Sequence, residues 1–211
     1  ILQRKGTAGQ EAAYATARML RHESTVIRIH ASRALLRMGK NIEEALPLMI
    51  LALEDEVFEI RRNCARAIVN MEEKAAEEVE YLADSLDIED QFVQLHIIAA
   101  IANMGQSGRI AVPALLGMLS NGEHMEIIVE TLGDLQAVEA TGVLVEIACS
   151  NSALRGKVAR SLTKIGRPAI PAIIEMLTSE KAQKQVYAAR VLANIGSEAR
   201  SAVPHLNEVR D

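Results

Sequence analysis

Apolar residues recur along the chain in a pattern that repeats six times. Each copy runs through small and branched apolar residues and closes on a large apolar residue, usually followed by glycine. The six closing pairs are Met38-Gly39, Met71-Glu72, Met104-Gly105, Leu135-Gln136, Ile165-Gly166 and Ile195-Gly196. The second residues of these pairs follow one another at steps of 33, 33, 31, 30 and 30 residues. A fixed period in this range predicts a solenoid, in which each unit buries its apolar face against its neighbours.

Within each copy, the apolar positions keep helical spacing. Four residues before the closing position, a branched aliphatic always stands: Leu35, Ile68, Ile101, Leu132, Leu162 and Leu192. Eight residues before it stand Ala31, Cys64, Ile97, Ile128, Val158 and Ala188, and five before it the residues are mostly small. Steps of three and four residues return to one face of an α-helix. These columns, with the large apolar residue of each closing pair, therefore predict the buried stripe of a first helix.

A second helix is predicted to follow each first helix after a short turn. Pro47, Pro113 and Pro204 stand eight residues past a closing glycine, and proline suits the first turn of a helix. Apolar stripes at helical spacing continue in the segments Leu46/Met49/Leu53, Val79/Leu82/Leu86 and Val112/Leu115/Leu119. Glycine favours the left-handed turn that ends a helix. Four glycines are therefore predicted to terminate first helices: Gly39, Gly105, Gly166 and Gly196.

The predicted fold is all-α, a right-handed α-α superhelix of about six helical pairs preceded by one unpaired helix at about 9–21. We expect one domain over residues 1–211, with further repeats able to flank it. No stretch alternates apolar and polar residues over the length of a β-strand. The repeats are predicted at about 24–55, 56–88, 89–120, 121–150, 151–179 and 180–211.

The chain resembles the HEAT-like repeats, armadillo-like α-solenoid units that include a subgroup named after phycobilisome lyases. The family pattern is matched best by Ile27-Arg28, Ala34-Leu35, Met38-Gly39 and Leu46-Pro47. The resemblance implies structural roles for Arg28, for Arg61 and Arg155 in the same column, and for Asp55, which matches the turn aspartate of the family. In the other repeats this column holds Gln94, Met125 and Gln185, so a continuous ladder of Asp–Arg pairs is not expected.

Charge is distributed unevenly along the chain, whose formal net charge is −5. Residues 1–70 and 151–211 are net positive, whereas residues 71–150 carry 15 acidic residues against two basic ones. One interpretation is a solvated helix face. The other is a binding surface for a basic protein or peptide, because second helices line the concave side of such solenoids. The residues predicted to form this concave acidic face are Glu77, Glu78, Glu80, Tyr81 and Asp84.

Composition and motifs disfavour several other classes of function. The acidic middle lacks the stripe of Lys and Arg that phosphate binding needs, so nucleic acid is not an expected partner. His22-Glu23 is the only His-Glu pair of the kind that repeated metal sites use, and Cys64 fits a buried core position. No Ser/His/Asp set, Cys/His set or Gly-rich phosphate loop is recognisable. We therefore expect no catalytic residue, no metal and no cofactor.

The apolar segments are too short to cross a membrane, and Ile1 is not followed by a signal-peptide pattern, so a cytoplasmic protein is expected. Together these features predict a non-enzymatic scaffold for protein–protein interaction that binds through its concave face. The alternative, implied by the resemblance to phycobilisome-lyase repeats, is a bilin lyase-like enzyme or an accessory subunit of one.

Overall fold

The apolar columns of the sequence lie on one face of each first helix and are buried. This holds in a computed structural model that describes the backbone of residues 2–210 and the side chains of residues 8–208. The column of branched aliphatic residues is at most 3% exposed in all six repeats. The prediction of a buried stripe is therefore confirmed at its most regular column. The column consists of Leu35, Ile68, Ile101, Leu132, Leu162 and Leu192.

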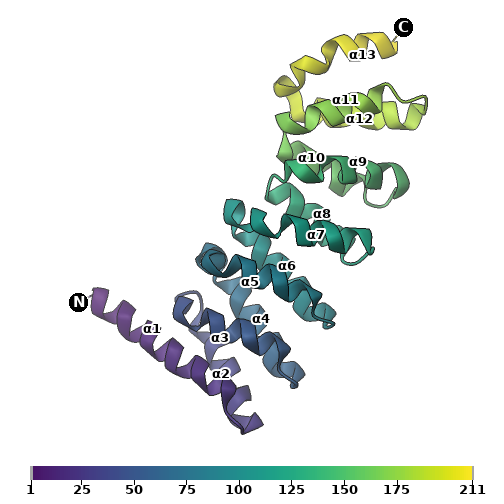
Figure 1. The fold of residues 1–211 in the computed structure, drawn as a ribbon. Coiled ribbons are helices and arrows are strands. Elements are labelled where there is room, and N and C mark those ends of the chain that lie inside the picture. The colour runs from purple at the N-terminus through teal and green to yellow at the C-terminus, as the bar shows by residue number, and fades with distance from the viewer. Residues whose placement is uncertain (1, 211) are drawn as a thin grey trace. The chain divides into compact units, whose positions relative to one another are not determined.

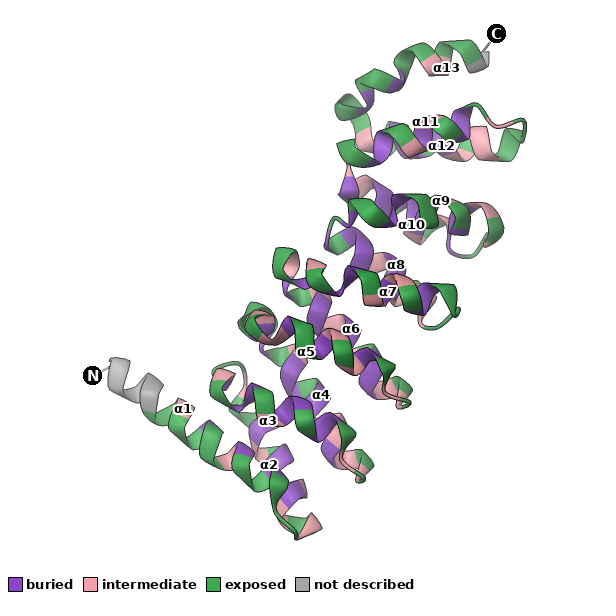
Figure 2. Ribbon diagram, viewed as in Figure 1, coloured by how far each residue is buried: buried purple, intermediate pink, exposed green. Residues whose placement is uncertain are grey.

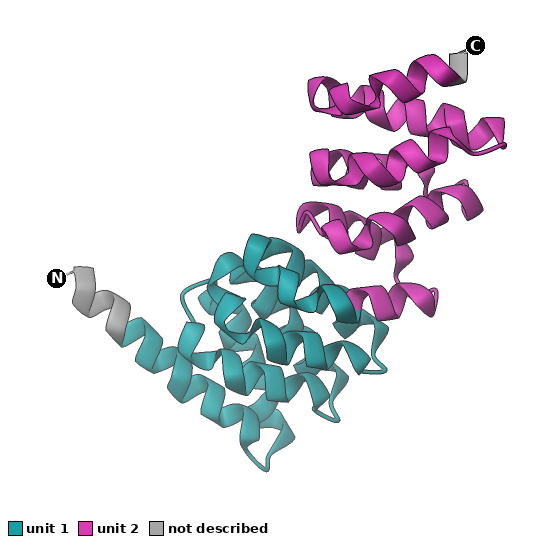
Figure 3. Ribbon diagram, turned by 45° about the horizontal axis from the view of Figure 1, so that its top comes forward, with its two compact units in different colours: residues 1–114 teal, residues 115–211 magenta. Residues whose placement is uncertain are grey.

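The described residues form α-helices and short 3-10 helices, with no β-strand among them (Figure 1). The chain divides into two compact units, residues 1–114 and 115–211, and the division falls within helix α7 (Figure 3). The first unit contains α1 (Leu2–Arg18), α2 (Thr25–Met38), α3 (Leu46–Leu51), α4 (Phe58–Asn70), α5 (Val79–Asp84), α6 (Gln91–Asn103) and the start of α7 (Val112–Ser120). Its 3-10 helices are η1 (Met19–Arg21), η2 (Glu43–Ala45), η3 (Ala52–Glu54), η4 (Glu72–Glu78), η5 (Ser85–Asp87) and η6 (Gly105–Ala111).

The second unit continues the same alternation of first and second helices. After the remainder of α7 it contains α8 (Met125–Asp134), α9 (Thr141–Ser150), α10 (Arg155–Ile165), α11 (Ile170–Leu177), α12 (Ala182–Ile195) and α13 (Val203–Arg210). Its 3-10 helices are η7 (Val138–Ala140), η8 (Arg167–Ala169) and η9 (Gly196–Ala202). The predicted series of helical pairs is thus confirmed.

Each unit has two layers of helices. In the first unit, α2 packs against α4 and α4 against α6, while α1 and α3 contact each other in the second layer. In the second unit, α8, α10 and α12 pack in sequence, and α11 contacts both α9 and α13. Buried residues lie where helices of the same unit face one another (Figure 2). The core of each unit therefore consists of aliphatic side chains packed between its helices.

Two details differ from the sequence prediction. Helix α1 begins at Leu2 rather than near residue 9, because Gly6 and Gly9 weaken the helical pattern without preventing the helix. Met38 belongs to the column of large apolar residues yet is 41% exposed, and Ile195 in the same column is half-buried. Both lie in the outermost of the six repeats, where fewer neighbouring repeats cover them.

The closing position of every repeat has a positive φ. Four of the six positions are glycines, but Glu72 and Gln136 adopt the same sign, with φ of 55° and 50°. Each repeat therefore has a left-handed residue in the turn between its two helices, whether or not that residue is glycine. Gly39, Gly166 and Gly196 have φ between 71° and 76°.

Candidate functional site

The residues predicted to form the acidic face lie together on α5 and the end of η4 in the first unit. Glu77, Glu80 and Asp84 are exposed, and Glu78 is half-buried. Tyr81 is 63% exposed, although tyrosine rings are normally well covered. One helical turn of α5 therefore presents carboxylates around a large aromatic ring. These five residues form the acidic face.

Some acidic residues near the acidic face are paired with a lysine, whereas those of the acidic face are not. Glu43 is bound by Lys74 at 2.7 Å, and Glu72 by Lys40 at 3.1 Å. Among the ion pairs of the described residues, none involves Glu77, Glu80 or Asp84. Their charge is consequently directed to solvent rather than neutralised within the fold.

Arg28 links its own repeat to the next one. Its Nε donates to Asp55 Oδ2 at 2.8 Å and its Nη2 donates to Glu56 Oε1 at 2.9 Å. Its Nη1 donates to the backbone carbonyl of His22 at 3.2 Å. The hydrogen bond to Asp55 is the main reason that the pKa of Arg28 is raised, so the guanidinium stays charged. This side chain therefore closes one turn and fixes the start of the following repeat.

Arg61 makes the same connection one repeat later. Its Nε donates to Asp90 Oδ2 at 2.9 Å, and its Nη1 donates to the backbone carbonyl of Asp55 at 2.9 Å. Asp90 is the N-cap of α6 and accepts from the backbone N–H groups of Phe92 and Val93. Burial raises the pKa of Asp90, but these hydrogen bonds and the charge of Arg61 outweigh it and lower the pKa overall.

Two other positions of the arginine column also contact a backbone carbonyl. The side-chain Nε2 of Gln94 donates to the carbonyl of Leu86 at 3.0 Å, and Arg155 Nε donates to the carbonyl of Ala148 at 2.8 Å. Both side chains thus retain a hydrogen bond to a backbone carbonyl that precedes their helix. The structure brings Arg28 and Asp55 together, and places Arg155 in the second unit away from any acidic partner among the described residues.

The histidines and cysteines are dispersed. His22 is exposed and its Nδ1 accepts from the backbone N–H of Ser24, whereas His96 stacks on Phe92 with ring centroids 4.0 Å apart. Cys64 is buried and Cys149 is half-buried, and both are free thiols. Among the described residues, no group of three or more His, Cys, Asp or Glu side chains could hold a metal ion.

A cation–aromatic cluster on the first helices was not predicted from the sequence. The guanidinium of Arg62 lies 4.0 Å from the ring centroid of Phe92 and 4.8 Å from that of Phe58. The two phenyl rings meet edge to face at 6.5 Å. The contact could have been predicted from the repeat alignment, because Phe58 and Phe92 stand at adjacent positions of neighbouring repeats. It joins α4 to α6 on the layer opposite the acidic face.

Comparison with known proteins supports the fold. Residues 12–102 match the family model of HEAT repeats. An engineered protein of solved structure is similar over 89% of this chain and 97% of its own, with a TM-score of 0.61 and 22% identity. The complex of CpcE and CpcF of phycocyanin lyase from Nostoc sp. PCC7120 is similar over 92% and 93%, with a TM-score of 0.58 and 16% identity. No curated protein matches the chain at a significant level.

Designed repeat proteins have the same architecture. A designed armadillo repeat protein in complex with the peptide (KR)4 is similar over 87% of this chain and 99% of its own, with a TM-score of 0.55 and 16% identity. None of the described helices is long and apolar enough to cross a membrane. Residues 12–102 thus match HEAT repeats, and the chain has the α-solenoid fold of these solved structures.

Proposed function

We propose that the chain is a non-enzymatic scaffold that binds a basic protein or peptide through the acidic face. The observation that carries this proposal is the exposed ring of Tyr81 among carboxylates that have no ion-pair partner in the described structure. Aromatic side chains flanked by charge are frequent anchors of protein interfaces. The carboxylates would accelerate the encounter with a cationic partner, and Tyr81 would slow its release.

Leu51 extends this surface onto the neighbouring second helix. It ends α3, is 65% exposed, and occupies the position that Asp84 has at the end of α5. A partner that lies across α3 and α5 would therefore meet an apolar side chain as well as the acidic face. The designed armadillo protein bound to (KR)4 supports the proposal, since it combines this architecture with an alternating Lys-Arg peptide.

The alternative of a bilin lyase-like enzyme rests on the likeness to the CpcE and CpcF complex. At 16% identity this likeness concerns the fold, and fold alone does not carry an activity. Protein binding by a scaffold is therefore the proposed function, and a lyase-like enzyme is the alternative.

The experiment uses the peptide (KR)4 as a probe, with association and dissociation followed by surface plasmon resonance. The variant Glu77→Lys/Glu78→Lys/Asp84→Lys should lower the association rate constant about tenfold or more at low salt. Added salt should weaken binding to the unmodified chain in the same way. Tyr81→Ala should mainly raise the dissociation rate, by about tenfold.

The matched control is the triple variant Glu123→Lys/Glu146→Lys/Glu175→Lys. It changes the net charge equally at exposed positions of the second unit. Charge reversal on α2, at Arg33 and Arg37, should also have little effect. If the control triple slows association as much as the acidic-face triple, total charge alone is responsible and the proposed surface is wrong.

A further inference from the structure

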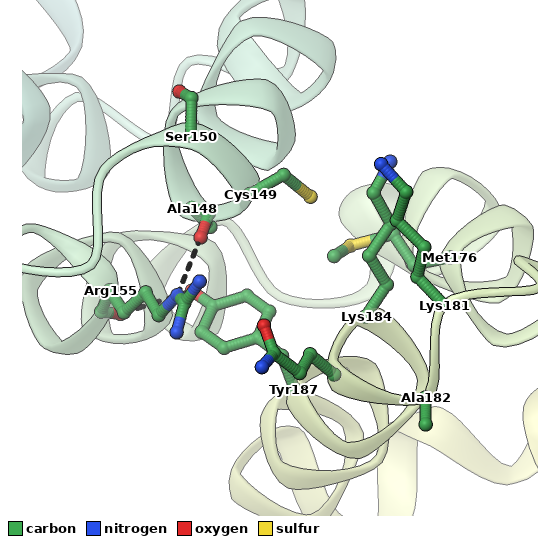
Figure 4. Close-up of a pocket in the computed structure, with 10 residues that line it drawn as sticks. Ala148, Cys149, Ser150, Arg155, Met176, Lys181, Ala182, Lys184 and Tyr187 are labelled. Carbon is green, nitrogen blue, oxygen red and sulfur yellow. Dashed lines mark hydrogen bonds between the residues drawn. The ribbon is translucent and has the colours of Figure 1, made fainter.

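A pocket of about 600 Å³ opens in the second unit where two successive repeats meet. It is lined by the end of α9, the start of α10, the end of α11 and the start of α12 (Figure 4). Its volume lies within the range of small-molecule sites. Its polar lining includes the side chains of Arg155, Lys181, Lys184 and Tyr187, and Met176 forms an apolar wall.

In the first unit, the equivalent arginine has a carboxylate partner. There Arg61 reaches the carbonyl of the preceding turn through one nitrogen and the carboxylate of Asp90 through two others. Asp90 is the N-cap of the next first helix, with φ −74° and ψ 100°. The corresponding partner of Arg61 thus comes from the following repeat. Arg28 has the same two kinds of contact, with Asp55 supplying the carboxylate.

In the second unit the carboxylate is replaced by a cation. Lys181 is the N-cap of α12, with φ −86° and ψ 106°, and so occupies the place that Asp90 has before α6. Arg155 retains its hydrogen bond to the carbonyl of Ala148 but has no carboxylate partner among the described residues. Its terminal nitrogens are left as donors beside the pocket, as Figure 4 shows.

The charge of the pocket is therefore unbalanced. Arg155, Lys181 and Lys184 line it, and none of the described residues that line it is acidic. Arg155 and Lys184 are half-buried, so water screens their charge less than at a free surface. An arginine, unlike a lysine, also offers a planar fork that suits a carboxylate or phosphate in two-point contact.

Tyr187 holds the frame of the pocket in place. Its hydroxyl donates to the backbone carbonyl of Arg155 at 3.1 Å, which ties α12 to the start of α10. Burial raises the pKa of this phenol, so the hydroxyl remains protonated and acts as the donor. The arginine is therefore anchored at its backbone and at one side-chain nitrogen, and its side chain forms part of the pocket wall.

We propose that this pocket binds a small organic anion, whose carboxylate or phosphate group takes the place of the missing aspartate against Arg155. Lys181 and Lys184 add charge on the side of α12, and the apolar part of the ligand lies against Met176 and the ring of Tyr187. The scaffold thus carries a ligand site in its second unit that is separate from the acidic face of its first unit.

The test is an NMR titration of the full chain with inorganic phosphate and, in parallel, with succinate, each against sodium chloride at equal ionic strength. We expect saturable shifts of amide signals within residues 148–155 and 181–187. A stronger response to phosphate identifies a phosphate ligand, and a stronger response to succinate a carboxylate. Occupancy should also slow the reaction of Cys149, which lines the pocket, with uncharged iodoacetamide.

Two variants test the role of the arginine. Arg155→Gln should weaken binding at least about tenfold, as expected for loss of a charge-assisted contact. Lys181→Asp should also abolish binding, because it restores the aspartate found in the first unit, and it should stabilise the fold rather than impair it. A stable Lys181→Asp protein that no longer binds therefore separates loss of the site from loss of structure.

Arg190→Gln is the matched control, since Arg190 is exposed on α12 and does not line the pocket. It should bind both anions as the unmodified chain does. The proposal is overturned if neither anion gives saturable shifts in the named segments. It is equally overturned if Arg155→Gln and Lys181→Asp bind as tightly as Arg190→Gln.

Discussion

Gly133 in α8 lies directly against the backbone of Ser161 in α10. A Cβ atom at position 133 would stand 2.6 Å from the Cα of Ser161, closer than two non-bonded carbon atoms can approach. Ser161 is buried, and its hydroxyl donates to the backbone carbonyl of Val129 at 2.7 Å. The two first helices are thus joined by a close contact and by a hydrogen bond from one helix to the backbone of the other.

Replacing Gly133 with alanine should therefore destabilise the second unit. The added methyl group would force α8 and α10 apart, and overpacking of this kind costs about 1–3 kcal/mol. Urea denaturation followed by circular dichroism measures the loss. Gly156→Ala in α10 is the control, because nothing lies within 4 Å of its Cβ position and alanine favours a helix. Equal stabilities of the two variants would show that the helices can separate without cost.

The contact between Gly133 and Ser161 could not be predicted from the sequence. Periodicity places each residue on one face of its own helix, but how closely two helices approach depends on the side chains of both. The buried columns could be predicted, because the period of an α-helix alone determines which positions point inward. The acidic face was predicted from the charge pattern and from the place of second helices in such solenoids, and the structure has all of its residues except Glu78 exposed. The pocket at Arg155 was not predicted, because it depends on how two successive repeats meet.

The register of the repeats gives a second prediction. Leu132 is fully buried in α8, so Leu132→Ala should lower the free energy of unfolding by roughly 2–5 kcal/mol. Glu126 lies on the exposed face of the same helix, and Glu126→Ala should be tolerated. Thermal and urea denaturation of both variants provide the comparison. Similar losses in the two would contradict the assignment of the buried face.

The closing position of each repeat gives a third prediction. Gly39 has φ 76° and ψ −144°, a conformation that essentially only glycine adopts, so Gly39→Ala should cost about 1–3 kcal/mol. No atom lies within 4 Å of the Cβ position, so the loss would come from the backbone alone. Glu72→Ala at the equivalent position should cost less than about 1 kcal/mol. There the backbone already holds an L-residue, and only an exposed ion pair with Lys40 is lost.

Glu72 and Gln136 illustrate where sequence reasoning is strong and where it is weak. The period predicts that a helix ends at these positions although neither is glycine, and the structure has a positive φ at both. What the period does not show is the conformation that glycine permits at Gly39, Gly166 and Gly196, where ψ lies between −144° and −134°. That difference depends on how each following turn meets its second helix.

The two thiols should differ in reactivity. Burial is the main reason that the pKa of Cys64 is raised to about 12, so this thiol remains protonated and inaccessible in the folded chain. Cys149 is half-buried and lines the pocket of the second unit. A thiol reagent at pH 8 should therefore modify one cysteine in the native protein and both in urea, with Cys149 identified by peptide mass spectrometry. Rapid native labelling of Cys64 would mean that the first unit opens readily.

Asp90 gives the last prediction, a dependence of stability on pH. Burial raises its pKa, but the hydrogen bonds from Arg61 and from the backbone of α6 lower it below the ordinary value of 3.8. The folded state therefore favours the ionised carboxylate. Its contribution is fully present above pH 3.8 and is lost as the pH falls through the lower pKa of the folded chain.

Asp90→Asn isolates this contribution, because asparagine can still cap α6 but cannot pair with the charge of Arg61. At pH 7 the variant should be less stable by roughly 1.5–3 kcal/mol, the value of a hydrogen bond to a charged group. Other carboxylates with lowered pKa values, such as Glu130 beside Lys157, titrate equally in both proteins and cancel in the difference. Urea denaturation from pH 7 to pH 2.5 should therefore show two curves that converge below pH 3.8. A difference that stays constant over this range would mean that the ion pair between Asp90 and Arg61 adds nothing to the fold beyond the cap.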